Sequence, residues 1–251
     1  MIDLYDRGLL LGDGLFETIL AVDGVFDHLS AHLERMAAGC VTLGLPRLDL
    51  AEAARVAQAA LGEYPVGRVA IRLTLTAGSG GRGLDRPEQP SPRLFATASP
   101  SAKPVGPARL MISSLRRNAD SPICQVKSLS YLESVLARRE ARLTGADEAL
   151  LLNHRGEIAC ASAANVFWWS NETLKTPALS CGVLAGIGRR RVLDRARDLG
   201  LATQEVCEPR EALDQADLIF LTNSLIGVRQ AYVADYCGHP LVAHLSEAFT
   251  D

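Results

Sequence analysis

The spacing of apolar residues along the first half of the chain predicts short strands and two helices. Apolar residues that recur every three or four positions indicate a helix, whereas alternation of apolar and polar residues indicates a strand with one buried face. On this basis we expect a hairpin over residues 18–22 and 25–28, helices over 30–43 and 51–61, and strands over 69–75 and 93–99. Ser30 and the capping box from Asp49 to Glu52 supply the expected helix starts, and Asp23-Gly24 supplies the hairpin turn.

The second half begins after a segment rich in proline, serine and alanine, residues 100–107. This composition is typical of a linker, so we place a domain boundary near residue 103. Beyond it we expect strands over 108–114, 149–153, 157–161, 165–170, 173–176 and 218–221, helices over 128–143 and 189–199, and a helix that begins at Glu208-Pro209. The pattern predicts an α/β (α+β) protein with a smaller domain over 1–103 and a larger one over 104–251.

Composition and charge exclude several classes of protein. The chain has 251 residues, of which 48% are hydrophobic, and a net charge of -3 with scattered arginines, which argues against a nucleic-acid surface. No apolar run approaches the roughly 20 residues of a membrane span, and the first residues lack the order of a signal peptide. The six cysteines show no metal-binding spacing, so we expect reduced thiols and no metal site. We therefore predict a cytoplasmic protein that binds neither nucleic acid nor membranes.

One lysine lies where its chemistry can matter. The chain has three lysines, and we expect Lys103 and Lys175 to be exposed to solvent. Lys127, by contrast, has apolar neighbours at an expected helix start. An amine that is partly withdrawn from water has a lowered pKa and can serve as a base or as a nucleophile toward an aldehyde. A lysine whose stem simply covers apolar surface would give the same pattern, and position alone does not separate the two readings.

Three further stretches could bind an anion or a small ligand. Residues 78–83 match the GxGxxG pattern, but the prolines that follow cannot begin the helix that a dinucleotide site needs, so we expect a glycine loop that presents Arg82. Residues 182–188 lead into a helix whose free N–H groups would form an anion site. The loop Thr222-Asn223-Ser224 follows directly after an apolar strand. In α/β proteins, ligands commonly bind at such strand ends.

An ordered set of short motifs runs through nearly the whole chain, from about Asp6 to Ala231. The motifs are Asp6-Arg7-Gly8, Gly12-Asp13-Gly14-Leu15-Phe16-Glu17-Thr18, His32-Leu33-Glu34-Arg35, Lys127-Ser128-Leu129, Gly145-Ala146-Asp147-Glu148-Ala149, Ala163-Ala164-Asn165-Val166-Phe167-Trp168 and Gly186-Ile187. Taken in order, these motifs resemble those of the class IV aminotransferase family, which consists of fold-type IV enzymes dependent on pyridoxal 5'-phosphate. The family includes branched-chain and D-amino-acid aminotransferases and 4-amino-4-deoxychorismate lyase.

The resemblance implies a role for each candidate site residue. It implies a homodimer with the cofactor in a cleft between the two domains, and it assigns Lys127 as the catalytic lysine that links to the cofactor. The other cofactor contacts that we expect are Arg35 and the N–H groups of Ile187 and Gly188 at the phosphate, Tyr131 at the phenolic oxygen, and Cys160, Asn223 and Ser224. Arg82 is the expected substrate contact. Gly188 stands where the family usually has threonine, so one hydroxyl contact is lost.

Two departures from the family pattern concern the reaction itself. Cys160 stands where family members usually carry a glutamate that keeps the pyridine nitrogen protonated, and Glu157 cannot replace it because an odd offset along a strand points to the opposite face. Ala77 stands where the lyase branch usually has arginine, although residues 78–83 and 222–225 look most like that branch. We expect a lyase that releases pyruvate from 4-amino-4-deoxychorismate and leaves 4-aminobenzoate, a step of folate synthesis. The alternatives are an amino-acid aminotransferase of the branched-chain or D-amino-acid type, and a cofactor-free binding protein on the same fold in which Cys160 is simply a small buried residue.

Overall fold

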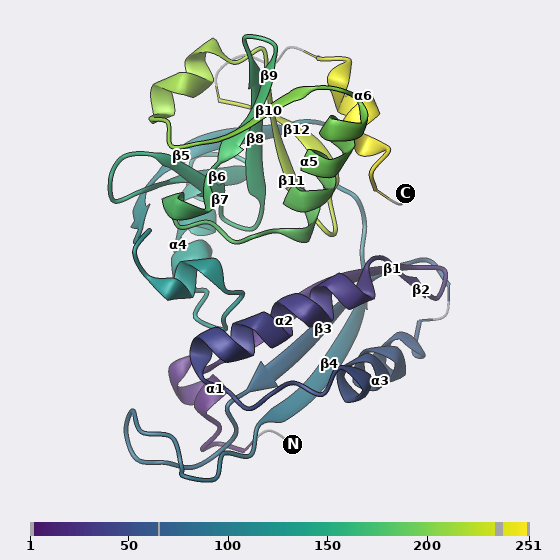
Figure 1. Cartoon of the computed structure of the whole chain (residues 1–251), viewed down its shortest axis with the longest axis vertical. Helices are drawn as coiled ribbons and strands as arrows, with labels where there is room; N and C mark the ends of the chain where they lie inside the picture. The colour runs from purple at the N-terminus through teal and green to yellow at the C-terminus, as the bar shows by residue number, and fades with distance from the viewer. Residues whose placement is uncertain (1–2, 65, 234–237, 250–251) are drawn as a thin grey trace. The chain divides into compact units, whose positions relative to one another are not determined.

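The structure is a computed structural model that describes residues 3–64, 66–233 and 238–249 (Figure 1). The chain forms two compact units. Unit 1 contains the residues up to Ala102 together with Val126–Tyr131, and unit 2 contains Lys103–Gln125 together with the residues from Leu132 onward. The short segment that carries Lys127 therefore belongs to the first unit although it lies far beyond it in sequence.

Unit 1 is an antiparallel sheet with two long helices on one face (Figure 1). Its strand order is β2-β1-β3-β4, with β1 at Gly14–Val22, β2 at Val25–Phe26, β3 at Arg68–Thr76 and β4 at Arg93–Pro100. The helices are α1 at Arg7–Leu11, α2 at Leu29–Leu43 and α3 at Leu50–Leu61. The apolar faces of α2 and α3 pack against the buried residues of β1 and β3. The helical spacing of apolar residues and their alternation along the strands therefore contribute to one core.

Most of the local signals in this unit are confirmed. Val22 pairs with Val25 around the expected turn, and the Asp49 side chain caps α3 by accepting from the N–H groups of Ala51 and Glu52 at 2.9 and 3.1 Å. The expectation that Ser30 caps the preceding helix is wrong. The helix α2 begins at Leu29, and its N-cap is His28, which adopts a left-handed conformation with φ of 54° and gives no side-chain cap.

The segment Val126–Tyr131 pairs with the start of β1 instead of forming a helix. Phe16 N–H donates to the Lys127 carbonyl and Leu129 N–H to the Gly14 carbonyl, both over 2.9 Å. Because these backbone groups are used by the strand, the helix that we expected over 128–143 begins only at Leu132. A Cβ atom added at Gly14 would lie 2.3 Å from the Leu75 carbonyl, so glycine is required where the chains approach.

Unit 2 is built on an eight-stranded mixed sheet of order β10-β9-β8-β11-β12-β5-β6-β7. The pairs β9/β10, β5/β12 and β5/β6 are parallel and the others are antiparallel. The strands are β5 at Ala108–Arg117, β6 at Glu148–Asn153, β7 at Ile158–Ala161, β8 at Asn165–Ser170, β9 at Thr173–Pro177, β10 at Ala202–Val206, β11 at Leu218–Asn223 and β12 at Gly227–Tyr232. Trp168, Phe167 and Phe220 are fully buried in this unit, where they fill its two largest cores.

Short helices connect and cover the strands of unit 2 (Figure 1). The α-helices are α4 at Leu132–Leu143, α5 at Ile187–Asp198 and α6 at Leu241–Ser246, and the 3-10 helices are η1 at Pro122–Gln125, η2 at Leu179–Cys181 and η3 at Arg210–Gln215. The helix expected at Glu208-Pro209 is therefore the 3-10 helix η3, and α5 begins two residues before its expected start. Within the described part of the chain, no helix is both long and apolar enough to cross a membrane.

Candidate active site

Lys127 extends into an aromatic corner of unit 1. The pairing of its segment with β1 places it beside Phe16, and Lys127 Nζ lies 4.2 Å from the centre of the Phe16 ring. The amine donates to Tyr131 Oη over 3.4 Å, and the Phe16 and Tyr131 rings meet edge to face with centres 4.9 Å apart. Two aromatic faces therefore shield the amine while a phenol fixes its position.

The same surroundings change the protonation of the amine. Burial, and after it the nearby guanidinium of Arg35, lowers the pKa of Lys127 from its ordinary value to about 8, while Glu17 opposes this change in part. At pH 7 roughly a tenth of the amine is therefore unprotonated, far more than for an ordinary lysine, and this fraction can act as a nucleophile or a base. This supports the reading of Lys127 as a reactive lysine over that of a lysine that merely covers apolar surface.

Glu17 holds the expected phosphate-binding arginine in place. Arg35 Nε and Nη2 donate to the two carboxylate oxygens of Glu17 at 2.8 and 2.6 Å, and His32 Nδ1 donates to Oε2 at 2.7 Å. Burial alone would raise the pKa of Glu17, but the hydrogen bonds from Arg35 and His32 outweigh burial and lower it. Burial lowers the pKa of His32, so this residue is neutral near pH 7. The motif that contains Glu17 assigns it no role, although Glu17 is the one acid within the apolar run of residues 14–22.

Arg72 adds a further positive charge to this corner of unit 1. Its guanidinium carbon lies 3.8 Å from the centre of the Phe16 ring. The alternation of residues 69–75 places Arg72 on the sheet face opposite the core, and that alternation was the sequence signal for it. Arg35, Arg72 and Lys127 together outnumber the single carboxylate of Glu17, so the corner attracts an anion.

Arg82, our predicted substrate contact, is exposed in the glycine loop of unit 1. The loop contains no helix, which confirms that residues 78–83 do not form a dinucleotide fingerprint. The loop is held by Arg7, which donates to the carbonyls of Leu84 and Asp85 at 2.9 Å each and forms an ion pair with Asp13. The Asp6-Arg7-Gly8 motif therefore positions this loop.

In unit 2, the start of α5 has the geometry of an anion site. Gly186 is the N-cap and offers no capping side chain, so the first N–H groups of the helix, including those of Ile187 and Gly188, point away from the helix without a side-chain acceptor. A Cβ atom at Gly188 would lie 2.7 Å from Thr222 Oγ1. Within the described residues, that fully buried hydroxyl has no hydrogen-bond partner. The structure thus places a free hydroxyl beside the position where the family's threonine is missing.

Asn223 and Ser224 follow Thr222 at the end of β11. Asn223 Nδ2 donates to the Ala163 carbonyl at 2.9 Å, and its Oδ1 accepts from the N–H groups of Leu225 and Ile226 at 2.8 and 2.9 Å. The Asn223 side chain therefore shapes the loop. Ser224 is half-buried in the same turn. The structure places Thr222, which was not among the predicted cofactor contacts, beside Gly188 at the start of α5.

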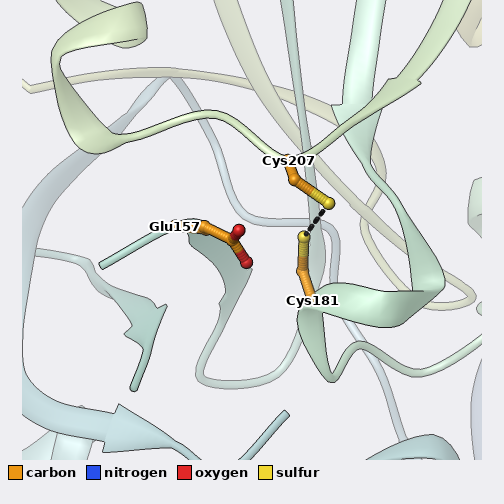
Figure 2. Close-up of side chains that lie close together, drawn as sticks. All are labelled: Glu157, Cys181 and Cys207. Carbon is orange, nitrogen blue, oxygen red and sulfur yellow. Dashed lines mark hydrogen bonds between the residues drawn. The ribbon is translucent and has the colours of Figure 1, made fainter. Parts of the chain in front are cut away.

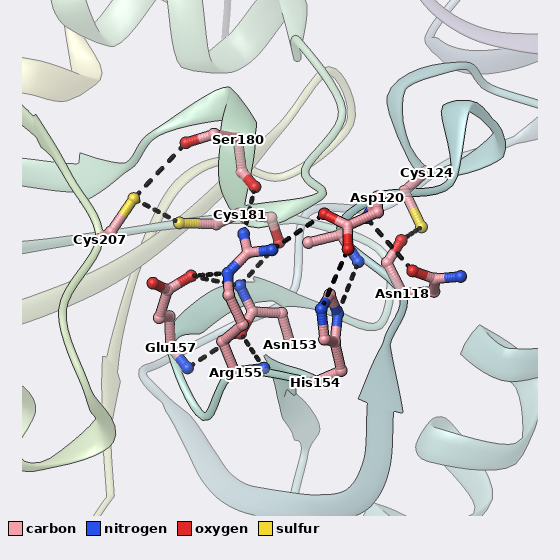
Figure 3. A network of polar contacts seen from close by, with 11 residues as sticks. Asn118, Asp120, Cys124, Asn153, His154, Arg155, Glu157, Ser180, Cys181 and Cys207 are labelled. Atoms are coloured by element: carbon pink, nitrogen blue, oxygen red, sulfur yellow. Dashed lines mark hydrogen bonds and ion pairs between the residues drawn. The ribbon is translucent and has the colours of Figure 1, made fainter.

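Cys160 lies in β7, all four residues of which are buried. Burial raises the pKa of its thiol, so Cys160 is neutral near pH 7. Glu157 is occupied elsewhere: its carboxylate lies near the thiols of Cys181 and Cys207 (Figure 2) and accepts from Asn153 Nδ2 at 2.6 Å and Arg155 Nε at 3.1 Å (Figure 3). These bonds support our inference that Glu157 does not take the place of the usual glutamate.

The fold and these motifs define a fold-type IV enzyme dependent on pyridoxal 5'-phosphate. The model of the family described as "Amino-transferase class IV" matches residues 14–232, and the chain belongs to this family. This confirms the predicted fold class and cofactor, and it favours an enzyme over a cofactor-free binding protein.

Individual relatives carry the names of two different activities. A provisionally named branched-chain-amino-acid aminotransferase of Methanocaldococcus jannaschii is 34% identical over 93% of this chain and 83% of its own length. The aminodeoxychorismate lyase of Vibrio harveyi is 30% identical over 90% of this chain and 85% of its own length. A solved structure of a provisionally named 4-amino-4-deoxychorismate lyase from Legionella pneumophila superimposes with a TM-score of 0.92, at 29% identity, and covers 98% of this chain and 92% of that one.

The residues present fit the cofactor of the family. In unit 1 an amine with a lowered pKa suits the aldehyde of pyridoxal 5'-phosphate, and the arginines suit its phosphate. In unit 2 the start of α5 has no side-chain cap, and the Thr222 hydroxyl has no partner among the described residues, so both offer donors of the kind that a phosphate accepts from.

Proposed function

We propose that the chain is a 4-amino-4-deoxychorismate lyase that releases pyruvate and leaves 4-aminobenzoate. The observation that carries this proposal is the buried, neutral Cys160 in place of an acid. The names of the relatives from Vibrio harveyi and Legionella pneumophila agree with it. The aminotransferase named for the Methanocaldococcus jannaschii relative is the second candidate, because that relative shares 34% of the aligned residues.

The proposed roles follow from the contacts of each residue. Pyridoxal 5'-phosphate supplies an electron sink for the bond changes at the substrate carbon. Lys127, with a pKa of about 8, would yield its place on the cofactor to the substrate amine, take the proton from the adjacent carbon and return a proton to the departing product. Tyr131 Oη orients the amine of Lys127 through the bond of 3.4 Å.

Each unit supplies candidate phosphate contacts of its own. Arg35, held by Glu17, supplies a charged donor, and Ile187 and Gly188 supply backbone N–H groups. We add Thr222, whose hydroxyl replaces the one lost with Gly188. Asn223 keeps the loop in shape while Ser224 and Arg82 remain our proposed cofactor and substrate contacts.

Cys160 bears on the choice of reaction through the charge of the pyridine ring. An ionised glutamate keeps the ring nitrogen protonated and makes the ring a strong electron sink, whereas a neutral thiol does so far less well. Transamination must move charge through the ring and place a proton on the cofactor. Elimination expels pyruvate and gains an aromatic product, so it suffers less from a weak sink. The neutral thiol therefore favours elimination.

A comparison of two reactions in two proteins tests the proposal. Purified wild type is mixed with aminodeoxychorismate and, in parallel, with a panel of amino-acid donors, while pyruvate and the pyridoxamine form of the cofactor are followed in single turnovers. We expect elimination to dominate in wild type and Cys160→Glu to raise transamination relative to elimination. Cys124→Ser, another buried thiol of unit 2, is the control. Faster transamination than elimination in wild type would make the chain an aminotransferase, and an unchanged ratio in Cys160→Glu would refute the role of Cys160.

We further propose a homodimer, because the resemblance implies that a partner chain completes each site, and we propose that the protein is cytoplasmic. Two-fold symmetry is the commonest arrangement of such pairs.

A further inference from the structure

Two thiols of unit 2 lie next to each other outside the proposed cofactor contacts (Figure 2). Cys181 ends η2 and is fully buried, and Cys207 follows β10 and is exposed. Their sulfur atoms are 3.3 Å apart. The parallel pairing of β9 and β10 brings the two cysteines together. Ala178, just before η2, donates its N–H to the carbonyl of Val206, which directly precedes Cys207, over 2.9 Å.

Glu157 completes a reactive arrangement around the two thiols. One ligand atom from each of Glu157, Cys181 and Cys207 lies within 4.8 Å of the others. Bonds from Asn153 and then Arg155 help lower the pKa of Glu157, and a bond from Cys181 lowers it further, so the carboxylate is ionised near pH 7 (Figure 3). Burial, together with the adjacent Cys207, raises the pKa of Cys181 to about 12. The buried thiol thus keeps its proton next to a group that can accept it.

A metal ion fits this arrangement less well than a covalent bond between the sulfurs. Two thiolates around tetrahedral zinc stand about 3.8 Å apart, which exceeds the observed 3.3 Å. The Arg155 guanidinium is also bound to the Glu157 carboxylate at 3.1 Å and would repel a cation there. A disulfide carries no charge and needs only a further approach of the two sulfurs to about 2 Å.

We propose that Cys181 and Cys207 form a reversible disulfide when the protein meets hydrogen peroxide. Cys207, as the exposed thiol, reacts first: its sulfur attacks the peroxide, the O–O bond breaks, and Cys207 sulfenic acid and one water are formed. Cys181 sulfur then attacks Cys207 sulfur, its proton passes to Glu157, and Glu157 returns this proton to the sulfenic oxygen, which leaves as a second water. Two thiols lose two electrons and one peroxide gains them, and a dithiol reductant reverses the change.

The disulfide would close a loop that contains Gly186–Gly188 and the whole of α5. Linking residues this far apart restricts the unfolded chain and stabilises the folded one. For this spacing we expect the thermal midpoint to rise by up to about 10 °C. The disulfide would therefore be a redox-dependent cross-link between the two ends of the segment that carries the start of α5.

Peptide mapping of the whole protein decides whether the bond forms. Protein is treated with hydrogen peroxide, remaining thiols are blocked with N-ethylmaleimide, and a non-reducing tryptic digest is analysed by mass spectrometry. We expect residues 176–189 to be joined to residues 198–210, with loss of the joined species after dithiothreitol. Cys181→Ser and Cys207→Ser should abolish it together with the rise in thermal midpoint. Cys124→Ser, which changes a buried thiol outside the pair, should retain both.

A variant of the carboxylate tests the proton transfer separately. Glu157→Gln should slow disulfide formation at least tenfold, a modest effect for removal of a general base, and leave sulfenic acid at Cys207 that dimedone traps. An unchanged rate would overturn the role of Glu157. Cys207 that over-oxidises while Cys181 stays alkylatable would overturn the disulfide. Stoichiometric zinc that copurifies with wild type and is lost in Cys181→Ser would also overturn it, in favour of a metal site.

Discussion

Removing the Lys127 amine should stabilise the cofactor-free protein near neutral pH. The pKa of Lys127 is about 8 in the folded protein against an ordinary value of 10.5, chiefly because burial disfavours the charged form. At about 1.4 kcal/mol per tenfold, this difference corresponds to about 3 kcal/mol. Between these two pKa values the folded protein binds fewer protons than the unfolded chain, so its stability rises with pH, and below pH 8 the full cost is present.

We therefore predict that Lys127→Met is more stable than wild type by about 3 kcal/mol at pH 7 and by only about 1 kcal/mol at pH 10. The free energy of unfolding is measured in urea at both pH values on protein freed of cofactor. Methionine keeps the apolar stem, and all other titrating groups are common to the two proteins. Lys103→Met, at an exposed lysine, is the control and should show no such pH dependence. A stability difference between wild type and Lys127→Met that is equal at both pH values would refute the reasoning.

Three further predictions concern the cofactor and assembly. Purified protein with bound cofactor should be yellow, and its reduction with borohydride should attach the cofactor to Lys127. A label on Lys103 or Lys175 in the peptide map would contradict our assignment. Thr222→Val should weaken pyridoxal 5'-phosphate binding about tenfold or more, as expected for loss of a hydrogen bond to a charged group. The urea stability of the cofactor-free protein should not fall, because the buried hydroxyl has no partner among the described residues. Equal affinity in an equilibrium titration would exclude the contact. Sedimentation should show a dimer, and a fully active monomer would contradict this.

Local signals predicted much of unit 1. The hairpin follows from Asp23-Gly24, and α3 follows from Asp49 and a stripe of apolar residues, because the groups that form each element lie within a few residues of one another. The start of α4 could not be predicted in this way. Residues near Lys127 have a helical pattern, yet their backbone groups bond to Gly14 and Phe16, more than a hundred residues earlier. A partner so distant in sequence leaves no periodicity to detect.

The same distinction applies to the candidate site: residues in local motifs could be predicted, whereas residues whose role depends on distant neighbours could not. Lys127 and Arg35 could be named from their motifs, and the absence of a helix after residues 78–83 followed from the prolines. Glu17 and Thr222 could not be given roles, because their importance depends on what surrounds them: Glu17 joins a strand to a helix, and Thr222 Oγ1 matters because it is buried without a partner among the described residues. The pair Cys181 and Cys207 likewise shows no spacing that predicts contact, and only the β9/β10 ladder brings it together.

The charges of unit 1 connect binding of an anion to the strength of the base. Arg35 lowers the pKa of Lys127, after burial, because two cations near each other oppose protonation. Glu17 offsets part of this charge but is itself shared between Arg35 and His32. An anion bound at Arg35 would neutralise the charge that acts on the amine and would therefore raise the pKa of Lys127. By reciprocity, the protonated amine favours the anion, so the residue that holds the phosphate in our proposal also adjusts the proton affinity of the catalytic lysine.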